Sequence, residues 1–171
     1  KKNINIGAAV SPEPFFNADK EQYRNTITRE FNTITLEQGL RFPQLKSCKE
    51  CPYDFSVADS IIDFAVRNNI KVRGHTLVYY QEVPSWIVTG NFSKEELKTI
   101  LREHIQTVVT RYRGKVFAWD VVNEDINPDG TLAESEWLKV IGPEYIELAF
   151  RWAREADPDA ILFYNGYDNS P

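Results

Sequence analysis

The run Trp119-Asp120-Val121-Val122-Asn123-Glu124 continues an apolar stretch that begins at Gly114. A near-continuous apolar run of this length is typical of a strand buried in a parallel sheet. Asn123 and Glu124 then fall at the carboxyl end of the strand, where α/β barrels and open α/β sheets place their chemistry. A carboxyl group with apolar neighbours is suited to act as a general acid. The alternative is a strand end that two polar residues simply cap.

Four further apolar stretches predict strands, and helical patterns lie between them. The strands are expected over residues 4–10, 31–36, 70–78 and 160–165. The helices are expected over about 19–29, 56–68, 93–113 and 143–157. This alternation of strand and helix predicts a parallel sheet flanked by helices.

Two of the expected helices carry start signals. Ser93 with Glu96 three residues later forms a capping box. Ser56 is expected to cap the start of the helix over about 56–68. The apolar positions of that helix recur at helical spacing and are expected to face the core: Ile61, Ile62, Ala65 and Val66.

A (β/α)8 barrel is favoured over an open doubly wound sheet. Polar and aromatic residues cluster after four of the five expected strands, which fits a barrel with one working face. The open sheet lacks support because Pro12-Glu13-Pro14 stands where a Gly-rich phosphate loop would follow the first strand. Five strands cannot close such a barrel. Residues 1–171 are therefore expected to be the N-terminal portion, strands 1 to 5, of a single (β/α)8 domain, with strands 6 to 8 missing from this chain.

Composition excludes several classes of partner. The 171 residues are 42% hydrophobic with a net charge of −5, which is typical of a globular domain with one core. Lys and Arg are dispersed, so nucleic acid is not expected to bind. No apolar run reaches the ~20 residues of a membrane span, so a membrane is not expected either. The 10 Phe, 8 Tyr and 4 Trp suit a packed core and also platforms that stack sugars or bases.

Cys48 and Cys51 are the only cysteines and lie in a polar loop. A zinc site needs two more ligands, and His75 and His104 belong to distant patterns, so no metal is expected. A local disulfide and two idle thiols both fit this spacing. The disulfide favours a secreted or periplasmic protein, because disulfides persist in oxidising compartments. The chain has no Met, so it is expected to begin at a processing boundary that hides any targeting peptide.

Four motifs stand in order along the chain at consistent spacing. They cover residues 31–37, 73–78 with 84–86, 119–124, and 162–167. Together they resemble glycoside hydrolase family 10, the retaining endo-β-1,4-xylanases, and residues 119–124 match that family's acid/base strand letter for letter. The match runs through the whole chain.

The resemblance implies roles for individual residues. Glu124 would protonate the leaving glycosidic oxygen and then activate water, and Asn123 would hydrogen-bond the sugar 2-hydroxyl. Glu37 and His75 would hold hydroxyls of bound xylose units, unless His75 is a satisfied core histidine and Glu37 caps a helix. Asn165 and Tyr167 would lie on the aglycone side. Trp86 is expected to pack rather than to bind sugar.

Several residues depart from the family's usual pattern on the glycone side. Gln38, Arg41 and Phe42 stand where the family has Asn, Lys and Trp. Tyr79-Tyr80-Gln81-Glu82 replaces Trp-His-Ser-Gln, so a carboxylate stands in place of a neutral amide. By the resemblance Gln38, Arg41, Tyr79 and Glu82 bind substrate, and we expect Glu82 to face Arg41 as a compensating pair.

The resemblance implies a retaining endo-1,4-β-xylanase that acts on xylan or xylo-oligosaccharides and needs no cofactor. Retaining hydrolysis also needs a nucleophilic carboxylate about 5–5.5 Å from the acid. The family carries it near the seventh strand, so it is not expected in this chain. Four other carboxylates near the same face do not match its position: Glu37, Asp120, Asp125 and Asp168. Asp120 is expected to point away from Glu124, because neighbouring side chains alternate along a strand.

The missing barrel units leave several arrangements open. They could come from a second chain or a missing segment, or two half-barrels could associate. A non-catalytic xylan- or glycan-binding protein with a barrel cleft is the alternative function, although binding alone does not require a carboxylic acid at Glu124. Decorated xylan or mixed-linkage glucan are alternative substrates.

Overall fold

The computed structural model describes residues 4–17 and 20–167. They form one sheet of five parallel strands in the order β1-β2-β3-β4-β5, so each strand pairs with its neighbour in sequence. The strands are β1 (Gly7–Val10), β2 (Thr33–Leu36), β3 (Lys71–Tyr79), β4 (Val116–Asn123) and β5 (Ile161–Asn165). The parallel sheet expected from the alternation of strand and helix is confirmed.

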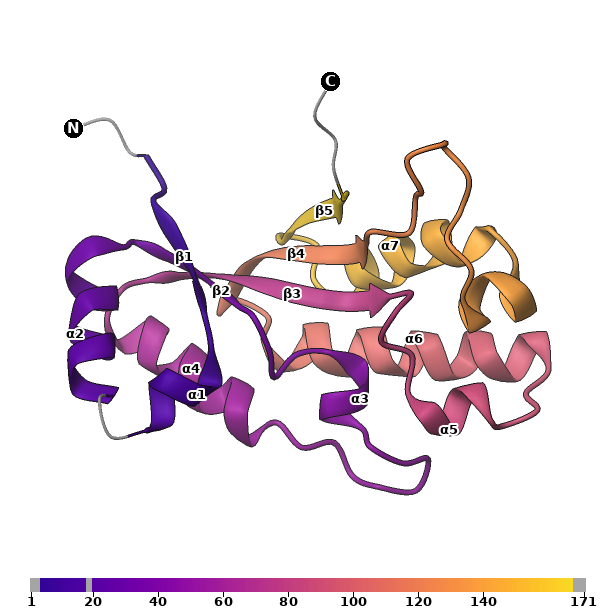
Figure 1. Cartoon of the computed structure of the whole chain (residues 1–171), viewed down its shortest axis with the longest axis horizontal. Helices are drawn as coiled ribbons and strands as arrows, with labels where there is room; N and C mark the ends of the chain where they lie inside the picture. Colours follow the sequence, from indigo (N-terminus) through magenta and orange to yellow (C-terminus); the bar gives the residue numbers. More distant parts are fainter. Residues whose placement is uncertain (1–3, 18–19, 168–171) are drawn as a thin grey trace.

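Four long helices connect the strands, and four shorter ones lie in the loops (Figure 1). The long helices match the expected ones: α2 (Lys20–Glu30), α4 (Ser56–Arg67), α6 (Lys94–Arg111) and α7 (Glu144–Ala156). The short ones were not expected: α1 (Pro12–Phe16), α3 (Phe42–Leu45), α5 (Ser85–Val88) and the π-helix η1 (Trp137–Ile141). Helices of four or five residues are too short to show a periodic apolar pattern.

Pro12 begins a helix instead of only ending a strand. Proline suits the first helical position because its fixed φ is helical and the missing N–H has no intrahelical partner there. Asp19, the expected first residue of the next helix, lies outside the described residues. In the described part of the chain, no helix is long and apolar enough to cross a membrane.

The first strand is shorter than expected. Pairing with β2 begins at Gly7, opposite Thr33, and Ile4 and Ile6 are 61% and 57% exposed. The expected strand over 4–10 is therefore wrong in its first three residues. β1 and β5 are the edges of the sheet, and β5 exposes the apolar side chains of Ile161 and Phe163.

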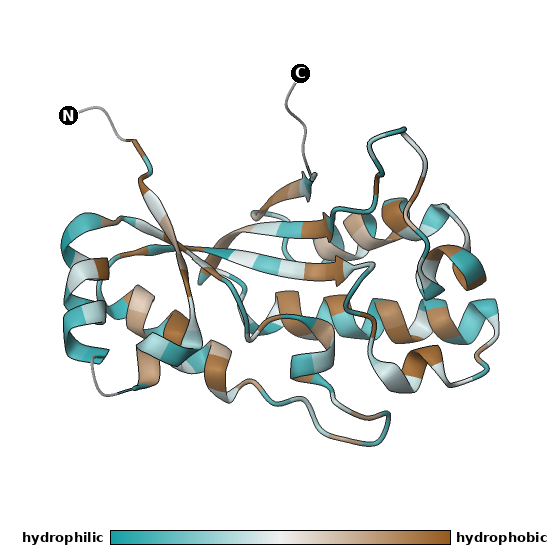
Figure 2. Cartoon of the chain, in the orientation of Figure 1, coloured by the Kyte–Doolittle hydropathy of each residue, from teal (hydrophilic) through white to brown (hydrophobic). Residues whose placement is uncertain are grey.

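Helices cover one face of the sheet. In Figure 1, α4 and α6 run beneath the strands, and α7 lies beside β4 and β5. The colouring of Figure 2 shows apolar and polar positions alternating along these helices, as amphipathic helices require. Ile61, Ile62 and Ala65 are fully buried as expected, whereas Val66 is 45% exposed and faces away from the core.

One of the two expected helix caps is present. Ser93 Oγ accepts from the Glu96 N–H while the Glu96 side chain accepts from the Ser93 N–H, so the capping box is confirmed. Ser56 is the first helical residue of α4 and not its cap. Its N–H donates to Asp54 Oδ1 at 2.9 Å, so an aspartate two residues earlier satisfies the helix start.

Gly74 allows β3 to lie against the indole of Trp119 on β4. A Cβ on Gly74 would stand 2.2 Å from two indole carbons, and Trp119 is fully buried. We expect Gly74→Ala to lower the free energy of unfolding by about 3 kcal/mol, because the ring has no space to move into. Urea denaturation measures this change.

Gly7→Ala is the matched control on the edge strand. A Cβ there would meet Thr33 O at 3.4 Å, an ordinary contact. We expect a change below about 1 kcal/mol. Equal losses in the two variants would contradict the packing of Gly74 against Trp119.

Candidate active site

Side chains from all five strands line a cavity of about 690 Å³ on the sheet face that the helices leave open. Four of the expected site residues lie at it: Glu37, Arg41, His75 and Asn165. Arg73 and Asp120 also line it, beside the apolar Phe117, Ile161 and Phe163. The cavity therefore combines several charged groups with the half-exposed apolar side chains of the edge strand β5.

A charged cluster occupies the wall of this cavity. The Asp120 carboxylate is 2% exposed and accepts from Arg73 Nε at 3.0 Å and from Arg73 Nη2. His75 Nδ1 lies 2.9 Å from the second carboxylate oxygen. This pairing stabilises a carboxylate that would otherwise be costly to bury. Asp120 contacts Arg73 and His75, and not Glu124.

His75 is not a buried core histidine. Its side chain is 17% exposed and lines the cavity, with Nδ1 held by Asp120. A histidine anchored through one ring nitrogen presents the other in a defined direction. This geometry suits a hydrogen bond from the free nitrogen to a ligand in the cavity.

Glu124 follows directly after β4 in an unusual backbone conformation. Its φ is +60°, in the left-handed region that residues other than glycine seldom adopt. Its N–H donates to Asn165 O at 2.7 Å, and the buried Asn123 accepts from Asn165 Nδ2 at 2.7 Å. Asn165 therefore ties the end of β5 to both residues, and this contact holds the backbone turn in place.

The side chain of Glu124 is held by a tyrosine. Tyr79 Oη donates to Glu124 Oε2 at 2.7 Å, and Gln81 Oε1 lies 3.0 Å from the same hydroxyl. Burial, with added contributions from the hydrogen bond and charge of Glu124, raises the pKa of Tyr79 above its ordinary value. The phenol therefore stays protonated and serves as a donor.

Asp125, next to Glu124, is fully buried and does not face the cavity. It accepts from the Tyr145 hydroxyl and from the Tyr80 N–H, the latter at 3.2 Å. Burial raises the pKa of Asp125 to about 6 against these two hydrogen bonds, and the charge of Glu124 adds to the rise. Asp125 thus links the turn after β4 to the loop after β3 and to α7.

The residues that depart from the family pattern contact one another. Arg41 and Glu82 form an ion pair, with side chains 21% and 28% exposed. The guanidinium carbon of Arg41 lies 5.8 Å from the centre of the Tyr79 ring. The expected pair of Glu82 with Arg41 is therefore present. Phe42 is buried and stacks on His104 at 3.6 Å, so it belongs to the core.

The remaining expected residues are more exposed. Glu37 accepts a hydrogen bond from Ser11 Oγ at the start of the loop after β1, and does not cap a helix. Gln38 is exposed beside it. Tyr167 is 65% exposed and does not line the cavity, and Asp168 lies outside the described residues.

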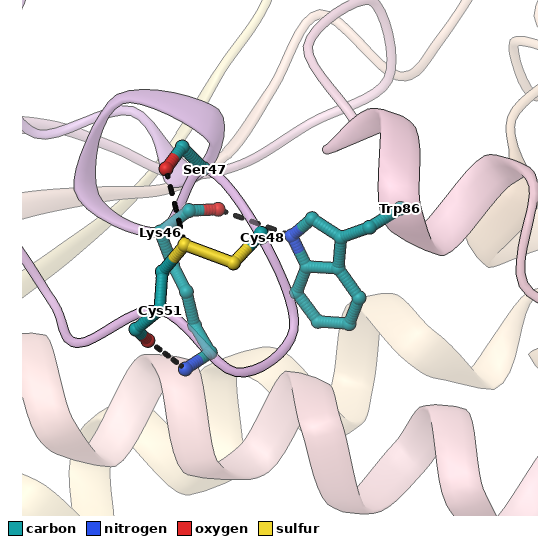
Figure 3. Close-up of a disulfide and its surroundings, with 5 residues drawn as sticks. All are labelled: Lys46, Ser47, Cys48, Cys51 and Trp86. Atoms are coloured by element: carbon teal, nitrogen blue, oxygen red, sulfur yellow. Dashed lines mark hydrogen bonds between the residues drawn. A yellow bond between two sulfur atoms is a disulfide. The ribbon is translucent and has the colours of Figure 1, made fainter.

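A disulfide closes the loop that follows β2 (Figure 3). Cys48 and Cys51 are bonded, which decides between the disulfide and two idle thiols. Lys46 Nζ donates to Cys51 O at 2.8 Å, while Trp86 Nε1 donates to Lys46 O at 3.1 Å. Trp86 also packs edge-on against Phe42, in line with its expected structural role. The loop after β2 is thereby fastened to α5, which follows β3.

The sequence analysis did not predict the bond from Arg73 to Asp120 or the contacts of Asn165 with Asn123 and Glu124. An arginine at an inward-facing strand position was the available signal for Arg73, but its partner depends on the register of β3 against β4. Among the described residues, no group of three or more His, Cys, Asp or Glu side chains is placed to hold a metal ion.

Comparison with known proteins gives consistent matches. Residues 1–170 match the model of Glycosyl hydrolase family 10. The chain is 44% identical to endo-1,4-beta-xylanase B of Thermotoga neapolitana over 168 residues, which is 98% of this chain and 48% of that protein. It is 45% identical to beta-1,4-xylanase of Dictyoglomus thermophilum, of which it covers 46%.

A solved structure agrees in fold. The crystal structure of xylanase 10B from Thermotoga petrophila RKU-1 in complex with xylobiose superimposes with a TM-score of 0.92 at 46% identity. The match covers 97% of this chain and 50% of that one. The chain thus spans about half the length of these relatives, and its five strands are part of a barrel.

The buried Asp125 predicts a pH dependence of stability. Its pKa of about 6 in the fold exceeds the ~3.9 of an unfolded chain, so the folded state binds more protons between these values. Stability from this group is therefore lost as the pH rises from 4 to 6. Asp125→Asn keeps an acceptor oxygen without the charge. We expect its free energy of unfolding, relative to the parent protein, to increase by about 2 kcal/mol between pH 4 and 7.

Urea denaturation at several pH values measures this difference. Asp129→Asn is the control, because hydrogen bonds from Thr131 lower the pKa of Asp129, and its trend should have the opposite sign. A flat difference for Asp125→Asn would contradict the burial of an ionisable carboxyl at this position.

Proposed function

Because this chain belongs to glycosyl hydrolase family 10, whose model matches residues 1–170, we propose that it supplies the acid/base half of an endo-1,4-β-xylanase active site. Both curated relatives described above are xylanases, and the solved relative was crystallised with xylobiose. The proposal concerns the complete protein, since the chain spans about half of each relative. The observation that carries it is Glu124 at the end of β4, whose carboxyl accepts from Tyr79 and whose backbone N–H donates to Asn165 O.

Glu124 is proposed to act twice. As an acid it gives a proton to the glycosidic oxygen while the bond to the anomeric carbon breaks, and as a base it takes a proton from the attacking water. Asn123, whose Oδ1 accepts from Asn165, has its amide N–H groups to offer the sugar 2-hydroxyl. His75 and Glu37 then bind hydroxyls in the cavity, which Asp120 also lines.

The nucleophile is proposed to lie in the part of the barrel that this chain does not include. Nearby carboxylates in the described residues are engaged elsewhere: Asp120 with Arg73 and His75, Asp125 with Tyr145, and Glu82 with Arg41. A retaining mechanism needs a free carboxylate about 5–5.5 Å from the acid. Glu124 itself does not line the cavity, and strands that continue the sheet beyond β5 would supply the nucleophile from the remainder of the barrel.

We also propose that the protein works in an oxidising compartment, outside the cytoplasm. The Cys48–Cys51 disulfide supports this, because such bonds persist where thiols are not kept reduced. Thiol labelling of the protein in separated cell and culture-medium fractions tests it, and reduced cysteines in a cytoplasmic pool would contradict it.

Replacing the proposed acid tests the function. In the complete barrel, with strands 6 to 8 supplied in the same polypeptide or as a second chain, we expect Glu124→Ala to lower the release of reducing sugar from β-1,4-xylan. The loss should be about 10³-fold, within the range that a general acid supplies. Binding of xylo-oligosaccharide, measured by calorimetry, should change little.

Glu147→Gln is the matched control, because it removes a carboxylate that is 72% exposed on α7. It should retain the parent rate. A parent protein that binds xylan without hydrolysing it would favour the alternative, a xylan-binding protein with a barrel cleft.

A further inference from the structure

We propose that Tyr79, Arg41 and Glu82 act as one unit that determines which oxygen of Glu124 delivers the proton. Tyr79 is the positioning residue, and the ion pair holds Tyr79. The inference rests on the proposed function, and it assigns a joint role to three positions at which this chain departs from the usual pattern of its family.

A continuous chain of contacts joins the three residues to the acid. Glu82 binds Arg41, and the guanidinium of Arg41 lies against the ring of Tyr79 at 5.8 Å from its centre. The hydroxyl of Tyr79 donates to Glu124 Oε2 at 2.7 Å. Arg41 comes from the loop after β2, Tyr79 and Glu82 come from the end of β3 and its loop, and Glu124 follows β4. Three successive loops therefore meet at one carboxyl group.

The hydroxyl proton of Tyr79 has two acceptors within reach. Gln81 Oε1 lies at 3.0 Å and Glu124 Oε2 at 2.7 Å. A carboxylate is the stronger acceptor, and it is also the nearer one. Gln81 Nε2 donates to the Tyr80 hydroxyl, so the amide of Gln81 is oriented by a second tyrosine. The proton of Tyr79 is thus directed to Glu124.

This donor makes the two oxygens of Glu124 unequal. Oε2 accepts from Tyr79, so in the acid form the transferable proton sits on Oε1. In the first step the glycosidic bond breaks as the proposed nucleophilic carboxylate bonds to the anomeric carbon, and the proton passes from Oε1 to the departing oxygen. In the second step the bond from the anomeric carbon to that carboxylate breaks as the water oxygen bonds to the carbon, and Oε1 accepts the proton that the water loses. Tyr79 keeps its own proton throughout, in accord with the upward shift of its pKa.

The ion pair prevents a conflict of charge. An unpaired carboxylate at Glu82 would place a second negative charge on the loop that carries Tyr79, near the carboxyl of Glu124. Arg41 neutralises it and also contacts the face of the Tyr79 ring, which a cation favours. Arg41 and Glu82 therefore support the tyrosine as a pair.

The test compares two aryl β-xylobiosides in the complete barrel, one releasing dinitrophenol and the other phenol. Dinitrophenolate leaves without a proton, whereas phenol needs general acid assistance. We expect Tyr79→Phe to lower kcat/KM for the phenyl substrate about tenfold and to leave the value for the dinitrophenyl substrate within about twofold. Glu82→Gln should act in the same direction but less strongly.

The double variant Tyr79→Phe/Glu82→Gln tests the coupling. If the residues form one unit, its loss on the phenyl substrate should equal that of Tyr79→Phe alone. Tyr112→Phe is the matched control, because this phenol also donates to a carboxylate, Asp59, but does not contact Glu124, and the ratio of the two substrates should stay at the parent value. Thermal denaturation establishes that each variant is folded.

Two results would overturn the proposal. Equal losses on both substrates would give Tyr79 a purely structural role, and additive losses in the double variant would separate the ion pair from the tyrosine. A parent barrel that hydrolyses neither substrate would overturn the proposed function itself, so the two failures are distinguishable.

Discussion

The buried carboxylate of Asp120 is the charge on which the arrangement of the open face depends. At 2% exposure it requires partners, and β3 supplies both of them, Arg73 and His75. Arg73 Nη2 also reaches Asn165 Oδ1 at 3.4 Å, and Asn165 binds the backbone of Glu124 and the side chain of Asn123. A single network therefore joins β3, β4 and β5 and fixes His75 and Asn123 relative to Glu124.

The walls of the site are joined in the same way. The loops after β2 and β3 are fastened together at the outside by Lys46 and Trp86, and near the acid by Arg41 and Glu82. A substitution of Arg41 or Glu82 in one loop removes a partner from a side chain of the other loop. Arg41 in the loop after β2 and Glu82 in the loop after β3 therefore hold their positions as a pair.

Periodicity predicted the five strands and the four long helices, because burial repeats with the spacing of each element. The sequence patterns did not predict features that depend on local geometry. The short helices fill loops without a repeat, Asp54 replaces Ser56 at the start of α4, and Val66 lies at the margin of an apolar stripe.

The residue types at the site could be read from strand ends and family motifs, but the pair of Glu82 with Arg41 was the one partnership predicted among the described contacts of the site. The bond from Arg73 to Asp120 depends on the register of β3 and β4, which shifts at irregular pairings. The turn at Glu124, with φ of +60°, depends on a carbonyl of β5 that lies far away in sequence.

The strand order has a consequence for how the chain folds during its synthesis. Because each strand pairs with the one made just before it, the sheet can grow outward from β1 as the polypeptide leaves the ribosome. Among β1 to β5 no pairing skips a strand, so each loop that is closed is a single strand–helix unit. β1 and β5 are the two free edges, and β5 presents Ile161 and Phe163, 50% and 39% exposed. Such an edge is a template for the next strand and, until that strand arrives, a surface for chaperones to shield.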